Sequence, residues 1–272
     1  MTHLLDYTLQ LADNAVIMGQ RLGEWCGHAP ILEQDIALTN TSLDHIGRAR
    51  NLYQFAAEQF NAMTAEEKAG CFSSVALYNK ATQNAVVDED DMAFLRDAWD
   101  YKNLLLVEQP NNDWAFTVAR SFLYDTFNFY LFTALKSSNN ATIAAIAEKS
   151  LKEVTYHMRW SSEWVIRLGD GTEESHILMQ QSLNSLWSYT GEMFTPNAAD
   201  KAMLEAGAGA DLSRVKQQWD ERVKAITEEA TLTIPANSWM QQGGKDGRHT
   251  EHLGFMLADM QFMQRAYPDM EW

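Results

Sequence analysis

The chain has 272 residues, of which 46% are hydrophobic, and this length is sufficient to bury one large core. Its formal charge of -16 opposes non-specific binding to nucleic acid or anionic membranes. The same charge opposes a polyanionic ligand that lacks a local basic patch, whereas it suits a basic protein partner or serves solubility alone.

Apolar residues recur with a helical period along most of the chain. They first predict a helix over about residues 3–25, which ends at the turn 27–30 and carries Glu24 on its inward stripe. A second helix is expected over about residues 30–60, with His45 on its apolar stripe. Because their connection is short, the two helices should be antiparallel neighbours.

Residues 61–91 interrupt this period with glycine, serine and an acidic run. We interpret them as a crossover or insertion of the kind that joins the second and third helices in ferritin-like bundles. The third helix is expected from its N-cap Asp113 to about residue 136, with Asp125 in an aromatic stripe. The fourth, over about residues 140–168, aligns Val154 with His157.

Residues 172–272 are expected to form accessory helices outside these four. The predicted segments are about 174–194, a short helix after Pro196, about 212–230 and about 251–266. The sequence therefore predicts an all-α, ferritin-like four-helix bundle with a long crossover and additional C-terminal helices, in a single domain over residues 1–272.

The inward polar residues suggest a degenerate di-iron site. In carboxylate-bridged di-iron bundles, two helices each give one carboxylate and two each give Glu-x-x-His, since a spacing of three returns both side chains to one face. Here Glu24 and Asp125 meet the two single positions. The paired positions contain His45 with Arg48 and Val154 with His157, so three of the six ligands remain.

Arg48 would place a positive charge where a metal cation should lie. Two buried carboxylates without a metal would repel each other, and Arg48 could act as their counter-ion. We therefore predict a buried network of Glu24, Asp125, Arg48, His45 and His157. In the alternative, Arg48 reaches solvent and each acid has only local partners.

The glycine-rich run 243–249 precedes the last helix and contains Lys245, Arg248 and His249. It could bind an anion such as a coenzyme A phosphate at the helix start, or it could be a helix-capping turn or a protein-docking loop. His249 and His252 are interpreted as surface histidines. Trp25, Trp187 or Trp272 could lie at an interface.

Two cysteines fit a reducing compartment and offer no zinc spacing. The chain start lacks a leader pattern, and no segment approaches the roughly 20 apolar residues that a membrane helix needs. We expect a cytoplasmic protein without nucleic-acid or membrane partners.

Four motifs, QRLGEWCGHAP (20–30), NLLLVEQPN (103–111), KEVTYHMR (152–159) and GGKDGRHTEHLG (243–254), resemble the C subunit family of the bacterial multicomponent phenylacetyl-CoA epoxidase. The resemblance covers nearly the whole chain in the right order. Only residues 62–87 depart from it, because this segment looks longer than the family usually has.

The resemblance implies a ferritin-like fold and a non-catalytic, structural role in phenylacetate catabolism. The partner would be a related A subunit that binds phenylacetyl-CoA, carries the di-iron centre and forms the 1,2-epoxide, in a heterodimer or heterotetramer. NADPH, FAD and an iron-sulfur cluster would belong to a reductase, and this chain would hold no cofactor. In isolation it could form a homodimer.

Two rival functions stay open. The chain could be an oxidase in its own right that holds one metal through Glu24, Asp125 and His157, although Arg48 opposes this. It could instead be a metal-free module that binds an acyl-CoA itself, which the negative charge and the lack of a basic cleft oppose.

Overall fold

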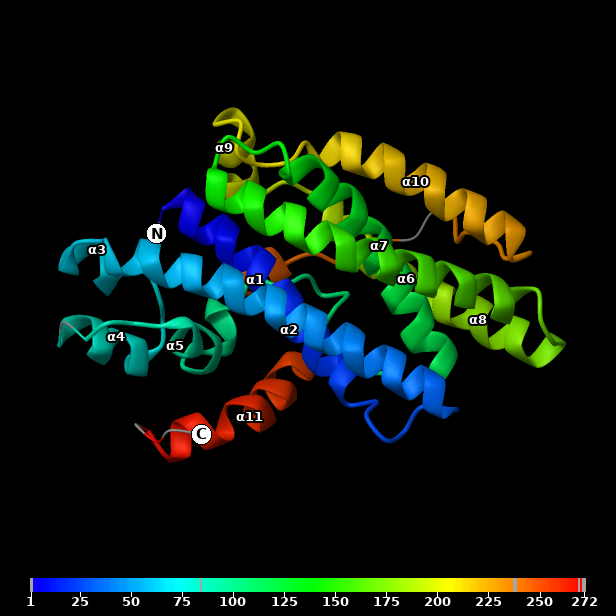
Figure 1. Ribbon diagram of the computed structural model, residues 1–272, viewed down its shortest axis with the longest axis horizontal. Helices are drawn as coiled ribbons and strands as arrows, with labels where there is room; N and C mark the ends of the chain where they lie inside the picture. The colour runs from blue at the N-terminus through cyan, green and yellow to red at the C-terminus, as the bar shows by residue number, and fades with distance from the viewer. Residues whose placement is uncertain (1, 84, 237–238, 269, 271–272) are drawn as a thin grey trace.

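The computed structural model describes residues 2–83, 85–236, 239–268 and 270. Within these ranges the chain forms helices and no strand, which confirms the all-α prediction (Figure 1). The longer helices are α1 (His3–Gly23), α2 (Leu32–Asn61), α6 (Trp114–Leu135), α7 (Ala141–Gly169), α8 (Glu173–Leu186), α10 (Leu212–Glu229) and α11 (Glu251–Ala266). The shorter ones are α3 (Ala65–Ala69), α4 (Val75–Thr82), α5 (Glu89–Phe94) and α9 (Ala198–Glu205).

Side-chain caps fix where the central helices begin. The carboxylate of Asp113 accepts a hydrogen bond from the Phe116 backbone N–H at 2.8 Å, which confirms the predicted N-cap of α6. Asn140 caps α7 in the same way through the Ile143 N–H at 3.1 Å. These caps satisfy amide groups that have no partner inside the helix.

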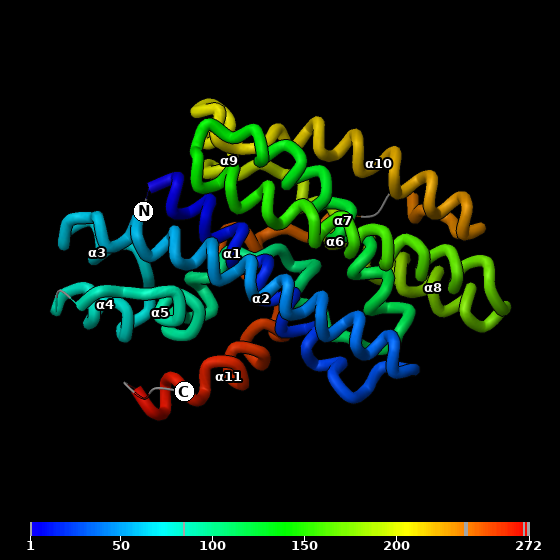
Figure 2. The backbone as a smooth tube through the Cα atoms, in the orientation of Figure 1, coloured from blue at the N-terminus to red at the C-terminus, as the bar shows by residue number. Residues whose placement is uncertain are grey.

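Two helix pairs form the centre of the molecule. The α1–α2 pair and the α6–α7 pair make the most extensive contacts, and α2 also packs on α7 (Figures 1 and 2). One continuous cluster of buried apolar side chains joins them. This arrangement supports the ferritin-like prediction and places the inward faces of α2, α6 and α7 opposite one another.

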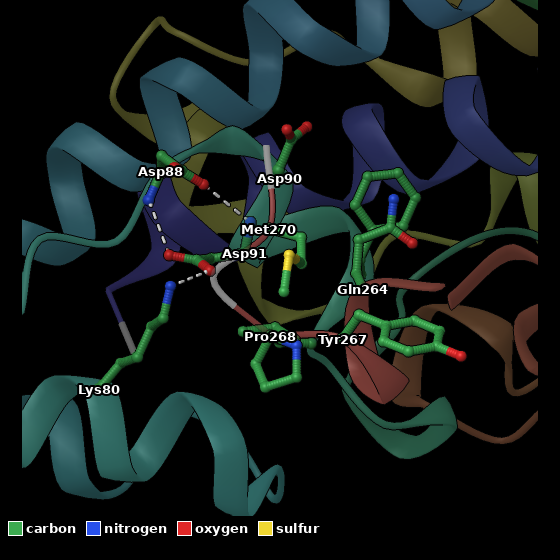
Figure 3. A pocket seen from close by; sticks show the side chains of 10 residues that line it. Lys80, Asp88, Asp90, Asp91, Gln264, Tyr267, Pro268 and Met270 are labelled. Carbon is green, nitrogen blue, oxygen red and sulfur yellow. Dashed lines mark hydrogen bonds and ion pairs between the residues drawn. The ribbon is translucent and has the colours of Figure 1, made fainter. Parts of the chain in front are cut away.

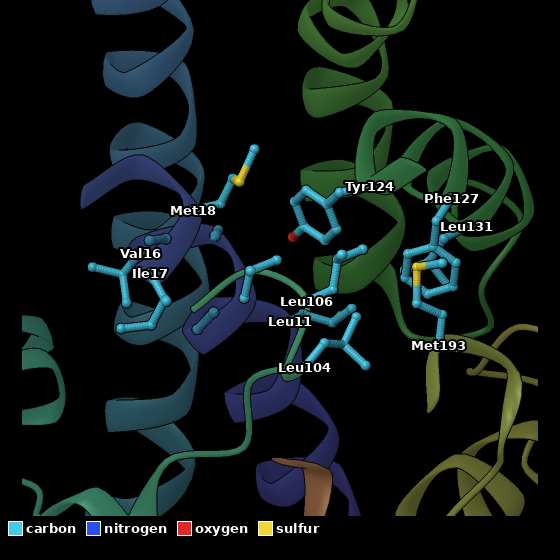
Figure 4. Packing of buried hydrophobic residues seen from close by; sticks show 14 of the residues in the cluster. Leu11, Val16, Ile17, Met18, Leu104, Leu106, Tyr124, Phe127, Leu131 and Met193 are labelled. Atoms are coloured by element: carbon cyan, nitrogen blue, oxygen red, sulfur yellow. The ribbon is translucent and has the colours of Figure 1, made fainter. Parts of the chain in front are cut away.

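The link between α2 and α6 is longer and more structured than the expected crossover over residues 61–91. It contains α3, α4 and α5 and continues through the 3-10 turn Ala98–Asp100 and irregular backbone to residue 113. Residues 103–107 of this irregular stretch are buried, and Figure 4 shows Leu104 and Leu106 between side chains of α1 and those of α6. The Leu-rich run therefore belongs to the core, although its lack of helical period left it without an assignment from sequence.

The C-terminal helices pack outside the central pairs, as expected. Helices α8 and α10 contact α6 and α7, α9 contacts α1, and α11 contacts α5. The expected helix over 174–194 ends earlier, at Leu186, and continues as the 3-10 turns Trp187–Tyr189 and Gly191–Phe194. Among the described residues, no helix is both long and apolar enough to cross a membrane.

Candidate functional site

Three buried side chains meet where α2, α6 and α7 face one another. His45, Asp125 and His157 each offer one potential ligand atom, and these atoms lie within 4.8 Å of one another. The two imidazole rings stack with centroids 5.2 Å apart, and all three residues are at most 2% exposed. Helix periodicity thus aligned these residues correctly, and we call them the central cluster.

Arg48 belongs to the same buried region. Its guanidinium donates a hydrogen bond from Nη2 to His45 Nδ1 at 2.8 Å and lies over the ring of Phe132. The residue is only 2% exposed, so the alternative in which Arg48 reaches solvent is wrong. Since guanidinium groups only donate, Arg48 fixes His45 Nδ1 as an acceptor.

A residue that was not predicted from the sequence completes the arrangement. Asp44 Oδ2 lies 2.9 Å from His157 Nε2, and its side chain is 36% exposed. Asp44 precedes His45 on α2 and reaches across to α7 from the edge of the helix. The sequence signal for Asp44 was its position next to His45, a predicted site residue. No local pattern, however, indicates that the Asp44 side chain contacts His157.

Glu24 lies outside the central cluster, so its predicted place in the buried network is wrong. Glu24 is the C-cap of α1, directly after its last residue Gly23, and at this end of the helix its carboxylate has polar partners outside the central cluster. The carboxylate is 44% exposed and pairs with Arg21 at 2.7 Å and Asn111 at 2.9 Å. Val154 is fully buried and apolar, so it offers no ligand.

Burial controls the charges in the central cluster. It raises the pKa of the Asp125 carboxyl to about 6, although His157, Ser161 and Arg48 oppose the shift. Burial, together with Arg48 and His157, lowers the pKa of His45 well below its usual range. Burial also lowers the pKa of Arg48, but a guanidinium starts so far above neutrality that it stays protonated.

The residues present do not fit a di-iron centre. Such a centre needs four carboxylates and two histidines, whereas Asp125 is the only carboxylate among the three residues that converge here. The paired position on α2 holds a cation bonded to one of the two histidines. The disagreement lies in the donor set itself, because an arginine cannot ligate a metal.

The glycine-rich loop 243–249 already holds an anion from the chain itself. Glu192 Oε1 accepts from the Gly243 N–H at 2.8 Å and the Lys245 N–H at 3.4 Å, and its Oε2 accepts from Leu105 N–H at 3.0 Å. Lys245 Nζ pairs with buried Asp200 at 2.9 Å. The prediction of a free anion site is therefore wrong for Lys245, whereas exposed Arg248 lies 3.8 Å from Asp246.

The His249 side chain is only 5% exposed and bonds to two distant residues, so its interpretation as a surface histidine is wrong. Its Nδ1 lies 2.9 Å from Glu108 Oε2 and its Nε2 lies 3.0 Å from the Tyr101 carbonyl oxygen. Glu108 also accepts from the Thr250 N–H at 2.6 Å and from Asn103 at 2.9 Å. These bonds attach the loop and the start of α11 to the buried segment around Glu108, and the N-cap residue Thr250 makes no side-chain cap bond of its own, so the helix-capping interpretation stays a prediction.

The comparisons with known proteins agree with the motifs. The family described as "Phenylacetic acid catabolic protein" matches residues 1–272. The chain belongs to this family. It is also 44% identical, over all 272 residues and the full length of both chains, to the C subunit of the 1,2-phenylacetyl-CoA epoxidase of Escherichia coli (strain K12). That match includes the segment 62–87, which we expected to be longer than usual.

A surface cavity of about 340 Å³ in this family member lies between α4, α5 and the end of α11 (Figure 3). Its lining includes Asp88, Asp90 and Asp91, and only Lys80 adds a positive charge, in an ion pair with Asp91 at 2.6 Å. Acidic walls repel phosphates. The cavity gives no support to the alternative in which the chain itself binds an acyl-CoA.

The tryptophans suggested for an interface pack internally where the structure describes them. Trp25 and Trp187 are half-buried against the core, and Trp25 donates to Thr117 at 2.9 Å. Trp272 lies outside the described residues. A role for these tryptophans in contact with a partner stays a prediction.

Proposed function

We propose that the chain is a non-catalytic, structural subunit of a multicomponent enzyme that converts phenylacetyl-CoA to its 1,2-epoxide. The observation that carries the proposal is the Arg48 guanidinium bonded to His45 within the central cluster. The helical bundle is intact, but its donor set, with Arg48 in one ligand position, cannot hold two iron ions. The reaction comes from the relative, whose name makes it a component of such an epoxidase.

In this proposal the chain stabilises a related catalytic A subunit, in a heterodimer or heterotetramer in the cytoplasm. The A subunit would carry the di-iron centre and bind phenylacetyl-CoA. A reductase with FAD and an iron-sulfur cluster would deliver electrons from NADPH. This chain would hold no cofactor of its own.

An apolar stripe on α2 supports contact with a protein partner. Leu32, Ile36 and Leu43 are 71%, 52% and 63% exposed, and their spacing places them on one side of the helix. Exposed apolar residues gathered on one helix face are typical of a surface that another protein covers. We assign this stripe to the A subunit.

Reconstitution of the epoxidase tests the proposal. The A subunit with the remaining components should form the epoxide at full rate only when this chain is added. A chain with Asp125→Asn should support the same rate as the unmodified chain, with His157→Gln as the matched second variant. A complex that assembles with either variant but loses epoxidation would contradict the proposed role.

One observation favours a second candidate, an oxidase with a single metal. Two histidines and one carboxylate converge, and this set suits ferrous iron. His45 takes the place that was predicted for Glu24. The candidate is weaker because a cation occupies the other ring nitrogen of His45.

A further inference from the structure

The central cluster leaves three buried atoms whose hydrogen-bonding capacity is unused. Among the residues that the structure describes, His45 Nε2, Asp125 Oδ1 and His157 Nδ1 are buried without a hydrogen-bond partner. Buried polar atoms in this state are uncommon and call for an explanation. Whether they can bind a metal depends on which of the two ring nitrogens in each histidine carries the proton.

The contact with Arg48 decides the tautomer of His45. A guanidinium has only N–H groups to offer, so His45 Nδ1 must accept with its lone pair. Burial and the nearby Arg48 keep the ring neutral. The single ring proton therefore lies on Nε2, which turns this atom into a donor that cannot ligate a metal.

His157 has the opposite arrangement at the cluster. Its Nε2 lies 2.9 Å from the Asp44 carboxylate, which accepts, so Nε2 donates. In the neutral ring the lone pair then lies on Nδ1. A metal-ligating histidine characteristically donates its second N–H to a carboxylate in this way. His157 is thus arranged like a ligand, and His45 is not.

We propose that Arg48 is a positioning residue that excludes metal ions by holding His45 in the tautomer with its proton on Nε2. The cluster then presents one donor, His45 Nε2–H, and two acceptors, Asp125 Oδ1 and His157 Nδ1. One donor and two acceptors suit a water molecule, which needs two to four polar partners, rather than a cation.

The inference goes beyond the proposed function, because it explains how a chain with three suitable side chains keeps metal out. It concerns the tautomer of one residue and holds whichever partner the chain assembles with. Failure of the proposed structural role and failure of this inference are therefore separate results.

The direct test is a nitrogen-15 NMR spectrum of the full chain labelled at histidine, in which the two ring nitrogens of neutral histidine are distinguished by whether they carry a proton. Spectra of His45→Asn and His157→Gln assign the two signals. We expect His45 to be protonated on Nε2 and unprotonated on Nδ1. A proton on His45 Nδ1 would overturn the inference.

A cobalt(II) titration of the full chain, followed by visible absorption, tests the consequence. Arg48→Glu provides a carboxylate that accepts from His45 Nδ1–H and frees the Nε2 lone pair. Partners that hydrogen-bond to a ligating histidine change metal affinity by about 10- to 100-fold, so Arg48→Glu should bind cobalt at least about 10-fold tighter than the unmodified chain. Arg48→Lys keeps a donor at the same place and should bind as weakly as the unmodified chain.

Nitrogen-15 spectra of the Arg48 variants distinguish an effect of the His45 tautomer from a simple change of charge. In Arg48→Glu the ring proton of His45 should move from Nε2 to Nδ1. Tight cobalt binding with the proton still on Nε2 would contradict the proposed mechanism, as would equal binding by Arg48→Lys and Arg48→Glu. The spectrum of the unmodified chain decides the question even if a variant fails to fold.

Discussion

Replacing Asp13 by Asn should destabilise the protein strongly, because Asp13 anchors the link between α5 and α6 to α1. Its carboxylate pairs with Arg96 through both oxygens, and both side chains are fully buried. It also accepts from the Tyr53 hydroxyl at 2.6 Å and from the Lys102 backbone N–H at 2.7 Å. Removing its charge leaves the Arg96 guanidinium buried without a counter-ion.

Breaking a buried ion pair from one side costs about 3–5 kcal/mol, so Asp13→Asn should lose about 4 kcal/mol. In a chain of this size that loss lowers the melting temperature by on the order of 10 °C. Urea unfolding monitored by circular dichroism measures the free energy of unfolding directly. The matched control is Asp220→Asn, which removes the half-exposed pair with Lys216 and should cost at most about 1 kcal/mol.

A second substitution distinguishes the uncompensated charge from lost packing. Asp13→Asn combined with Arg96→Met removes both charges and keeps an acceptor for the Lys102 N–H. It should recover at least about 2 kcal/mol relative to Asp13→Asn alone. A single variant no more destabilised than Asp220→Asn, or a double variant worse than the single one, would refute this reasoning.

Three further predictions concern the site and the surface. Because the pKa of Asp125 rises from 3.8 to about 6, its stability contribution is complete at acid pH and is lost as pH rises through that range. Relative to Asp125→Asn, the unmodified chain should lose about 3 kcal/mol between about pH 4 and pH 7 in urea unfolding, and parallel curves would contradict this. Glu108→Gln turns one of the two acceptor oxygens that hold Thr250 and His249 into an N–H donor and should cost about 3 kcal/mol, with faster hydrogen exchange at the start of α11; unchanged exchange there would refute it. Leu43→Glu should weaken binding to the A subunit at least about 10-fold in calorimetry, whereas exposed Val75→Glu on α4 should not, and equal effects would exclude the α2 stripe.

Sequence periodicity predicted the central helices well because their signals are local. Asp113 begins α6 through a bond only three residues away. His45, Asp125 and His157 lie on apolar stripes, and a stripe must face the core whatever its partner helix. Their convergence follows from helix geometry together with one assumption about which helices face one another.

The errors arose where a residue depends on a helix end or on a distant segment. Glu24 was placed by extending a stripe to the C-cap of α1, where the half-exposed carboxylate pairs with Arg21 and Asn111 instead. Asp44 reaches His157 across 113 positions of sequence, and Glu192 fills the loop at Gly243 from 51 positions away. No local pattern encodes such contacts, since they exist only once the helices have packed.

The central claim is that this chain holds no iron and serves a catalytic partner. The most direct measurement is iron content by mass spectrometry, on the chain expressed alone, loaded with ferrous iron without oxygen and then desalted. The account predicts iron well below one equivalent for the unmodified chain. Iron at one or two equivalents, lost on replacing Asp125 or His157, would contradict it and make this chain an oxygen-activating enzyme.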